Sequence, residues 1–241
     1  MKYIIFTLSF FIAITANSQI TKPEASEVWQ PEPRVVQAPK NAPPSDAIIL
    51  FDGKNLNAWE SIKEGSAKWK VADDYFTVTK GTGDIQTKES FGSVQLHIEW
   101  RTPTKIEDEG QGRGNSGVFF QNRYEVQILD SYENRTYSNG QAGSIYKQHI
   151  PLVNAMRAPG EWQVYDIIFA QPVFNKDSLK VKSGYLTVFH NGVLIQNNAE
   201  LYGTTEYIGL PKNLAHGEGP IQLQDHGNPI SYRNVWVRRL D

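Results

Sequence analysis

Two side chains in one short segment could carry out acid–base or sugar-binding chemistry. Residues 124–130 read Tyr-Glu-Val-Gln-Ile-Leu-Asp, so polar and apolar residues alternate at the start of the segment. Because successive side chains of a β-strand point to opposite faces, Glu125 and Gln127 share one face. Residues 114–121 also have strand composition, and Asn122-Arg123 predicts a tight turn between the two strands. An acid beside an amide on one face suits a binding groove, although a solvated surface is the alternative.

Two further segments, residues 94–101 and 221–226, alternate apolar residues with Gln, His, Glu or Arg rather than with Lys and Thr. Such planar polar groups pair with sugar hydroxyls, and aromatic rings supply stacking platforms. We therefore expect one sheet with a polar concave face for a polyhydroxylated ligand, against the alternative of a sheet with one wetted face. The residues expected to bind there are Glu125, Gln127, His97, Glu99, Arg101, Gln222, Gln224 and His226, with Asn115 and Asp130 at the rim.

Composition excludes several classes of function. The chain has 241 residues, of which 39% are apolar, a length that a single all-β domain can use. Its formal net charge is −2 and it has no basic run, so we expect no nucleic-acid partner. It has no cysteine, which excludes disulfides, thiol nucleophiles and thiolate metal sites. His97-Ile98-Glu99 and Asp225-His226 could offer metal ligands, but neither HxH nor HExxH spacing occurs, so we predict no metal and no other cofactor.

The N-terminus has the pattern of a targeting segment. Lys2, an apolar run over residues 3–14 and small residues at 16–18 predict a signal peptide cleaved after Ser18, and therefore export to the periplasm or the cell exterior. The run is shorter than the ~20 apolar residues of a membrane span, so we expect no membrane insertion. Six prolines in residues 19–46 predict a linker or an N-terminal arm, and a folded domain is expected over residues 47–241.

Short segments of strand composition fill the expected domain, and no stretch sustains helical periodicity over three turns. This pattern predicts an all-β, two-sheet antiparallel β-sandwich. The expected strands cover residues 48–51, 69–71, 75–79, 91–101, 117–121, 125–129, 162–170, 185–191, 208–210, 221–224 and 231–238. The residues predicted to face the core between the sheets are Val94, Leu96, Ile98, Val118, Phe120, Val126, Ile128, Ile221 and Leu223.

Residues 50–59, Leu-Phe-Asp-Gly-Lys-Asn-Leu-Asn-Ala-Trp, resemble the opening signature of the 3-keto-disaccharide hydrolase family. The resemblance covers residues 47–241 in family order. Its further motifs lie at residues 114–117, 124–130, 142–146, 160–162, 190–192, 221–227 and 232–235. It implies a concanavalin-like jelly roll and an exported enzyme that cleaves glycosides whose glucose unit is oxidised at C3.

The implied chemistry needs a base, an acid and an electrophile. A C3 ketone acidifies the C2 hydrogen, so that a base can remove it and the enolate can expel the C1 substituent before water adds back. By residue type and family position, Glu125 and His226 are the acid–base candidates. Arg101, Lys147 and Arg157 could polarise the ketone oxygen.

Three other interpretations stay open. Retaining glucanases of this fold class use two glutamates around a central aspartate, but here Gln127 is central and Asp130 has the opposite strand parity. Retention needs two carboxyl groups ~5 Å apart. A non-catalytic carbohydrate-binding module would need the amides and aromatic residues without an acid–base pair. A structural or interaction protein would leave Glu125 and His226 unexplained. Fold alone does not choose among these functions.

Overall fold

The computed structural model describes residues 22–40 and 42–240, and the chain divides into two units, residues 1–36 and 37–241. In the first unit, the described residues form a short 3-10 helix, η1 (Pro23–Ser26), followed by extended chain in which Trp29 and Val35 are largely exposed. The predicted signal peptide, residues 1–18, lies outside the described residues. Among the helices of the described residues, none is long and apolar enough to span a membrane.

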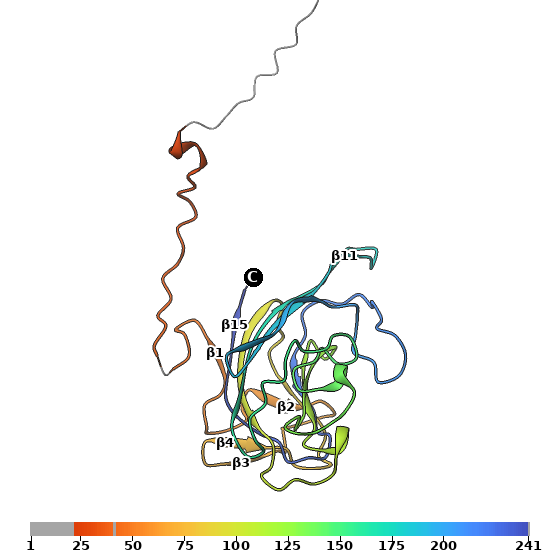
Figure 1. The fold of residues 1–241 in the computed structure, drawn as a ribbon. Helices are drawn as coiled ribbons and strands as arrows, with labels where there is room; N and C mark the ends of the chain where they lie inside the picture. The colour runs from red at the N-terminus through yellow and green to blue at the C-terminus, as the bar shows by residue number, and fades with distance from the viewer. Residues whose placement is uncertain (1–21, 41, 241) are drawn as a thin grey trace, which may run out of the picture. The chain divides into compact units, whose positions relative to one another are not determined.

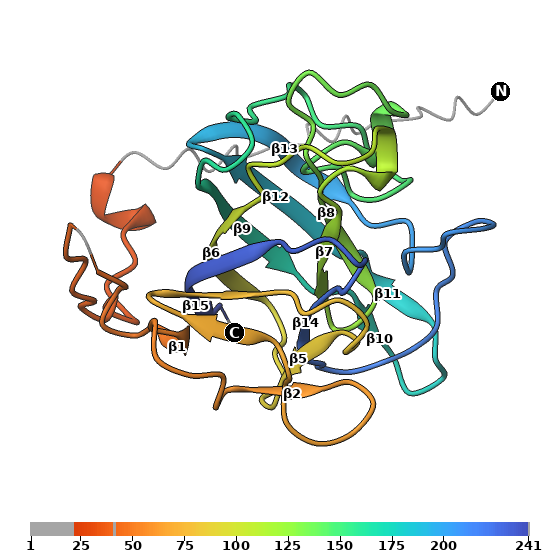
Figure 2. The same cartoon turned by 90° about the horizontal axis from the view of Figure 1, so that it is seen from below.

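The second unit is an antiparallel β-sandwich, which confirms the predicted fold class (Figure 1). One sheet has the strand order β13-β12-β9-β6-β15-β4-β3, with β1 paired to β15, and the other has the order β2-β5-β14-β7-β8. Figure 2 shows the second sheet in front of β6, β9 and β12. The strands of the larger sheet are β1 (Ile48–Phe51), β3 (Lys70–Ala72), β4 (Tyr75–Thr77), β6 (Val94–Arg101), β9 (Gln163–Ala170), β12 (Tyr185–His190), β13 (Val193–Glu200) and β15 (Ser231–Arg239). Those of the smaller sheet are β2 (Trp59–Ser61), β5 (Ile85–Thr87), β7 (Ser116–Phe120), β8 (Tyr124–Ile128) and β14 (Ile221–Leu223).

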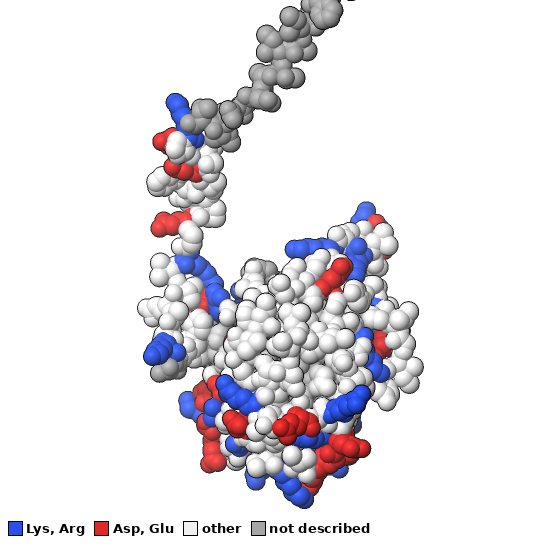
Figure 3. Space-filling model, in the orientation of Figure 1, with Lys and Arg blue, Asp and Glu red and all other residues white. Residues whose placement is uncertain are grey.

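Three small elements complete the unit. They are the hairpin of β10 (Val173–Phe174) and β11 (Lys180–Lys182) and the 3-10 helices η2 (Gly110–Gly112) and η3 (Ser138–Gly140). On the face of this unit that Figure 3 shows, Lys and Arg atoms are interspersed with Asp and Glu atoms, so no extended patch of one sign appears there.

The core has the register that alternation predicts. All nine residues predicted to face it are at most 1% exposed. Burial of an apolar side chain of this size stabilises the fold by ~1.5 to 3 kcal/mol, so a one-residue slip, which would turn these side chains outward, is strongly disfavoured. The β7–β8 hairpin is one residue longer at its turn than predicted, because Phe120 pairs with Tyr124 and leaves three residues between them. Two of these, Gln121 and Asn122, have positive φ.

Two differences from the predicted strands lie in the part of the chain between β12 and β14. Residues 208–210 form an exposed loop rather than a strand, although their composition is apolar. In contrast, β13 was not predicted, because its second half, Gln196 to Glu200, is polar. Pairing with β12 orders that segment, and such tertiary pairing commonly overrides intrinsic strand propensity.

Candidate active site

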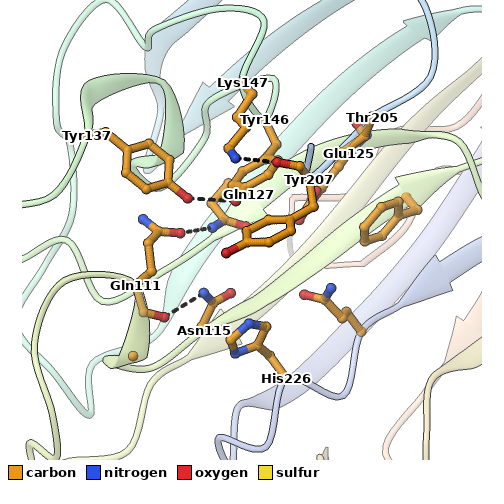
Figure 4. Close-up of a pocket in the computed structure, with 13 residues that line it drawn as sticks. Gln111, Asn115, Glu125, Gln127, Tyr137, Tyr146, Lys147, Thr205, Tyr207 and His226 are labelled. Carbon is orange, nitrogen blue, oxygen red and sulfur yellow. Dashed lines mark hydrogen bonds between the residues drawn. The ribbon is translucent and has the colours of Figure 1, made fainter. Parts of the chain in front are cut away.

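A pocket of about 780 Å³ lies on the outer face of the smaller sheet (Figure 4). Strands β7 and β8 form its floor, and its walls come from η2, the loops after β8 and β13 and the segment after β14. Its lining residues are Gln111, Gly112, Asn115, Phe119, Glu125, Gln127, Tyr137, Tyr146, Lys147, Thr205, Tyr207, Gln224 and His226. The wall after β13 is fixed to β8, because the backbone N–H of Glu125 donates to Thr205 Oγ1 at 3.0 Å. Six residues that the sequence pointed to therefore meet here: Glu125, Gln127, Asn115, Lys147, Gln224 and His226.

Glu125 is the one carboxyl group among the described lining residues, and only 5% of it is exposed. Burial, and secondarily the charge of Asp84, raises its pKa from 4.5 to about 8. Its partner across the β7–β8 ladder is Phe119. The neighbouring Gly117 leaves the space that the carboxyl group occupies, because a Cβ at this position would lie 2.5 Å from Glu125 Oε1. The site thus holds a carboxyl group that gains or loses its proton near neutral pH.

Three tyrosine rings surround the ammonium group of Lys147. Its Nζ lies 4.4 Å from the ring centroid of Tyr207, 5.5 Å from that of Tyr146 and 5.7 Å from that of Tyr137. It also donates a hydrogen bond to the Tyr207 carbonyl at 2.5 Å. The hydroxyls of Tyr137 and Tyr146 are 2.6 Å apart, and burial followed by this hydrogen bond raises the pKa of Tyr146. This wall therefore offers one positive charge and neutral hydroxyl donors.

The opposite side of the pocket is polar. Figure 4 shows His226 beside Asn115, away from Tyr137 and Lys147. The side-chain amide of Asn115 donates to the Gln111 carbonyl at 2.7 Å, which fixes it against η2. His226 is exposed at the mouth, and Gln224 is held next to β7 because its backbone N–H donates to the Gly117 carbonyl at 3.1 Å.

The prediction that His97, Glu99 and Arg101 share this pocket is wrong. All three lie on β6, which belongs to the larger sheet, and they point to the outer face of that sheet. Alternation along a strand tells whether a side chain faces the core, but it does not tell which of the two sheets holds the strand. Residues of one parity on β6 and on β8 therefore lie on opposite outer surfaces of the sandwich.

Each of these three side chains has partners on the larger sheet. His97 Nδ1 lies 2.7 Å from Asp166 Oδ1, and Glu99 Oε2 accepts from Arg233 Nε at 2.6 Å. Burial opposes the charged form of His97, but Asp166 and Glu99 raise its pKa to about 9. Burial likewise opposes ionisation of Glu99, yet hydrogen bonds from His97, Asn234 and Arg233 lower its pKa to about 2. The guanidinium of Arg101 lies 4.6 Å from the ring centroids of both Tyr75 and Trp162.

Three more predicted positions lie outside the pocket. Asp130 is not at its rim but buried, and its Oδ2 accepts from Arg113 Nε at 2.8 Å. Gln222 has the expected parity on β14, but its amide donates to Asp84 Oδ2 at 2.5 Å. Arg157 donates to the Trp162 carbonyl at 2.7 Å.

Sequence reasoning missed most of the lining residues outside the strands, and it also missed Phe119 on β7. Gln111 lies in the short 3-10 helix η2, and Tyr137, Thr205 and Tyr207 lie in irregular segments, where side-chain direction follows no period. Tyr146 was within reach, because it ends the motif at residues 142–146. Loop residues enter a site through tertiary contacts, which periodicity does not encode.

The raised pKa of Glu125 predicts that the free energy of unfolding falls as pH rises. Its folded-state pKa exceeds the unfolded value, so the stability that its bound proton provides is present below about pH 4.5 and is lost as pH rises to about 8. At about 1.4 kcal/mol per pH unit, the upper limit of this loss is about 5 kcal/mol. Glu125→Gln should therefore unfold at a higher temperature than the wild type at about pH 9, with a smaller difference at about pH 5. Glu99→Gln is the matched control, because the lowered pKa of Glu99 predicts destabilisation at neutral pH; a pH-independent effect of Glu125→Gln would contradict the prediction.

Comparison with known proteins identifies a family. The model of the 3-keto-alpha-glucoside-1,2-lyase-like domain matches residues 46–238. A protein of Bacteroides thetaiotaomicron named 3-keto-disaccharide hydrolase is 25% identical over 238 residues, covering 80% of this chain and 78% of that protein.

Two crystal structures from Parabacteroides distasonis ATCC 8503, both named as candidate glycosyl hydrolases, are similar. The first is 55% identical with a TM-score of 0.88 and covers 91% of this chain and 97% of its own. The second, at 21% identity and a TM-score of 0.59, covers 81% and 94% and shares the fold. Because the family match spans nearly the whole sandwich, the chain belongs to the family of 3-keto-alpha-glucoside-1,2-lyase-like domains.

Proposed function

We propose that this chain is an enzyme that cleaves glycosides carrying a ketone at C3 of a glucose unit, by removing the C2 proton and expelling the C1 substituent. The observation that carries the proposal is Glu125, a carboxyl group buried in a sugar-sized pocket with its pKa raised to about 8. A base is most effective when its pKa lies near the working pH. The names of the relatives support the substrate class, because one family description is a 1,2-lyase and one relative is a hydrolase of 3-keto-disaccharides.

The lyase reaction and the hydrolase reaction break the same C1–O bond and differ by the addition of water. Removal of the C2 proton gives an enolate whose negative charge rests on the C3 oxygen. Collapse of the enolate breaks the C1–O bond and leaves an alkene between C1 and C2, while the leaving oxygen takes up a proton. Addition of water across that alkene then gives the 3-keto sugar, so that elimination plus hydration equals hydrolysis.

The pocket has groups for each charge that this reaction develops. In its ionised form Glu125 takes the C2 proton. Lys147, the one ammonium or guanidinium group among the described lining residues, supplies positive charge for the enolate oxygen. His226 at the mouth can give a proton to the departing oxygen, and the neutral hydroxyl of Tyr146 is a second donor. The amides of Asn115 and Gln224 suit the remaining sugar hydroxyls.

The alternatives are less well supported by this geometry. A retaining glucanase needs a second carboxyl group ~5 Å from the first, whereas Glu125 is the one carboxyl group among the described lining residues. A carbohydrate-binding module needs hydrogen-bonding groups and aromatic rings but no carboxyl group with a pKa shifted toward the working pH, a feature typical of catalytic sites.

The fate of the C2 hydrogen tests the proposal. We expect cleavage of a 3-keto-glucoside but not of the same glucoside without the ketone, with deuterium from heavy water incorporated at C2 of the hydrolysis product. A substrate deuterated at C2 should lose that label and react more slowly. Cleavage of the unoxidised glucoside with the C2 hydrogen retained would support an oxocarbenium mechanism instead, and sugar binding without turnover would support the binding module.

A further inference from the structure

Four polar groups form a continuous row beneath Glu125. They are the Ser116 carbonyl, the side-chain amides of Gln127 and Gln111, and the Gly140 carbonyl. The two amides meet at 3.0 Å, and Gln111 Nε2 lies 2.9 Å from the Gly140 oxygen. The other end of the Gln127 amide lies 3.0 Å from the Ser116 oxygen and 3.0 Å from Glu125 Oε1.

The two side-chain amides of this row cannot provide a donor for every oxygen in it. Both of its ends are carbonyl oxygens, which accept hydrogen bonds and cannot donate them. If the Gln127 nitrogen points to the Ser116 carbonyl and the Gln111 nitrogen points to the Gly140 carbonyl, the two side-chain oxygens face each other at 3.0 Å. If Gln127 instead donates to Gln111, its oxygen faces both the Ser116 carbonyl and the carboxyl group of Glu125. If the Gln127 nitrogen stays toward the Ser116 carbonyl and Gln111 turns over to donate to the Gln127 oxygen, the Gln111 oxygen faces the Gly140 carbonyl. Every arrangement therefore leaves one oxygen opposed to another, and buried polar contacts of this kind are costly.

The proton on Glu125 decides which arrangement is preferred. An ionised carboxylate accepts, so it favours the orientation in which the Gln127 nitrogen donates to both Glu125 Oε1 and the Ser116 carbonyl. A neutral carboxyl group can itself donate, so it favours the orientation in which the Gln127 oxygen faces Glu125 and the nitrogen donates to Gln111. Proton binding and amide orientation are thus coupled.

We propose that Gln127 and Gln111 are positioning residues that set the proton affinity of Glu125 in opposite directions. Gln127 stabilises the ionised carboxylate by donating to it. The Gln111 nitrogen donates to the Gly140 carbonyl and to Thr136 Oγ1, which turns the Gln111 oxygen toward Gln127. Gln111 therefore competes for the same N–H, because its oxygen attracts the Gln127 nitrogen away from Glu125. The inference rests on the proposed function only in making Glu125 the base; the coupling itself needs no substrate.

Other titratable groups also face Glu125 and stay constant in the test. Asp84, which precedes β5, raises its pKa, and the negative charge of Glu125 in turn raises the pKa of Tyr146. The remaining titratable side chains of the pocket are Tyr137, Lys147, Tyr207 and His226. These groups lie outside the amide row and are unchanged by substitutions within it.

The test is a titration of the Glu125 carboxyl group in two matched variants. Gln127→Met and Gln111→Met keep the length of the side chain and remove one amide each. Infrared difference spectra of the free protein report the protonated carboxyl group, and the band is assigned by its loss in Glu125→Gln. We expect Gln127→Met to raise the midpoint by about one pH unit and Gln111→Met to lower it by about the same amount, because one hydrogen bond to the charged form is lost or gained. Gln224→Met, another lining amide outside the row, should leave the midpoint unchanged.

Opposite shifts support the coupling, and shifts in the same direction or no shift in both variants overturn it. If a Met variant fails to fold, the corresponding Asn variant is measured in its place, since the shorter side chain breaks the same contact. Cleavage of 3-keto-glycosides is measured separately. If the two midpoints move apart but no 3-keto-glycoside is cleaved, the proposed function fails and the coupling stands. The coupling fails if cleavage occurs and the midpoints do not move apart.

Discussion

Replacing Glu125 by Gln should lower kcat for a 3-keto-glycoside by roughly 10²- to 10⁴-fold, the usual contribution of a positioned base. The amide has the same size as the carboxyl group and fits the space beside Gly117, so the fold should be kept. It cannot accept the C2 proton, however, so the chemical step should be affected more than binding. We expect KM to change much less than kcat, since the amides of the pocket hold the sugar throughout the reaction. Steady-state kinetics with the purified variant measure both constants.

Glu99→Gln is the matched control for that experiment. It makes the same chemical change, but on β6 of the larger sheet, outside the pocket. Turnover per folded molecule should stay close to that of the wild type, measured well below the melting temperature because the bond to Arg233 is weakened. A loss in Glu99→Gln as large as that in Glu125→Gln would show that activity depends on the outer face of the larger sheet. Near wild-type turnover in Glu125→Gln would remove this residue from the mechanism.

The comparison of Glu99 with Glu125 shows how far sequence reasoning reaches for this fold. Strand alternation correctly predicted that both carboxyl groups point away from the core, since burial of the apolar parity is decided by local pattern. It could not place the two strands, because β6 and β8 have similar patterns and their sheets are chosen by long-range pairing. The family resemblance added what alternation lacked, because it selected Glu125 and His226, and both line the pocket.

The walls of the pocket were the harder part to predict. Tyr207 directly precedes residues 208–210, whose apolar composition predicted a strand. Those residues instead form an exposed loop. What fixes the loop is a set of single contacts, such as the bond from the Glu125 N–H to Thr205 and the Lys147 ammonium on the Tyr207 carbonyl. Such contacts join residues ~80 and 60 positions apart and leave no periodic trace in the sequence.

Substituting Asp for Ile128 should prevent folding, and this is the largest stability effect that we expect. Ile128 is fully buried on β8, in the parity that faces the larger sheet. The change removes an apolar side chain whose burial contributes ~1.5 to 3 kcal/mol and also requires burial of an unpaired carboxyl group, at a cost of several kcal/mol more. Together these losses are of the size of the whole stability of a typical domain, ~5 to 15 kcal/mol.

Ile168→Asp is the control that isolates position from chemistry. Ile168 follows the fully buried Ile167 on β9 and is 45% exposed, because its parity points to solvent. We expect this variant to be soluble and to show a cooperative thermal transition, whereas Ile128→Asp should give insoluble protein or no transition by circular dichroism. Folded Ile128→Asp beside unfolded Ile168→Asp would mean that both strands present the opposite faces to the core. In that case Glu125, whose side chain points to the opposite face of β8 from Ile128, would lie inside the sandwich and could not reach a sugar.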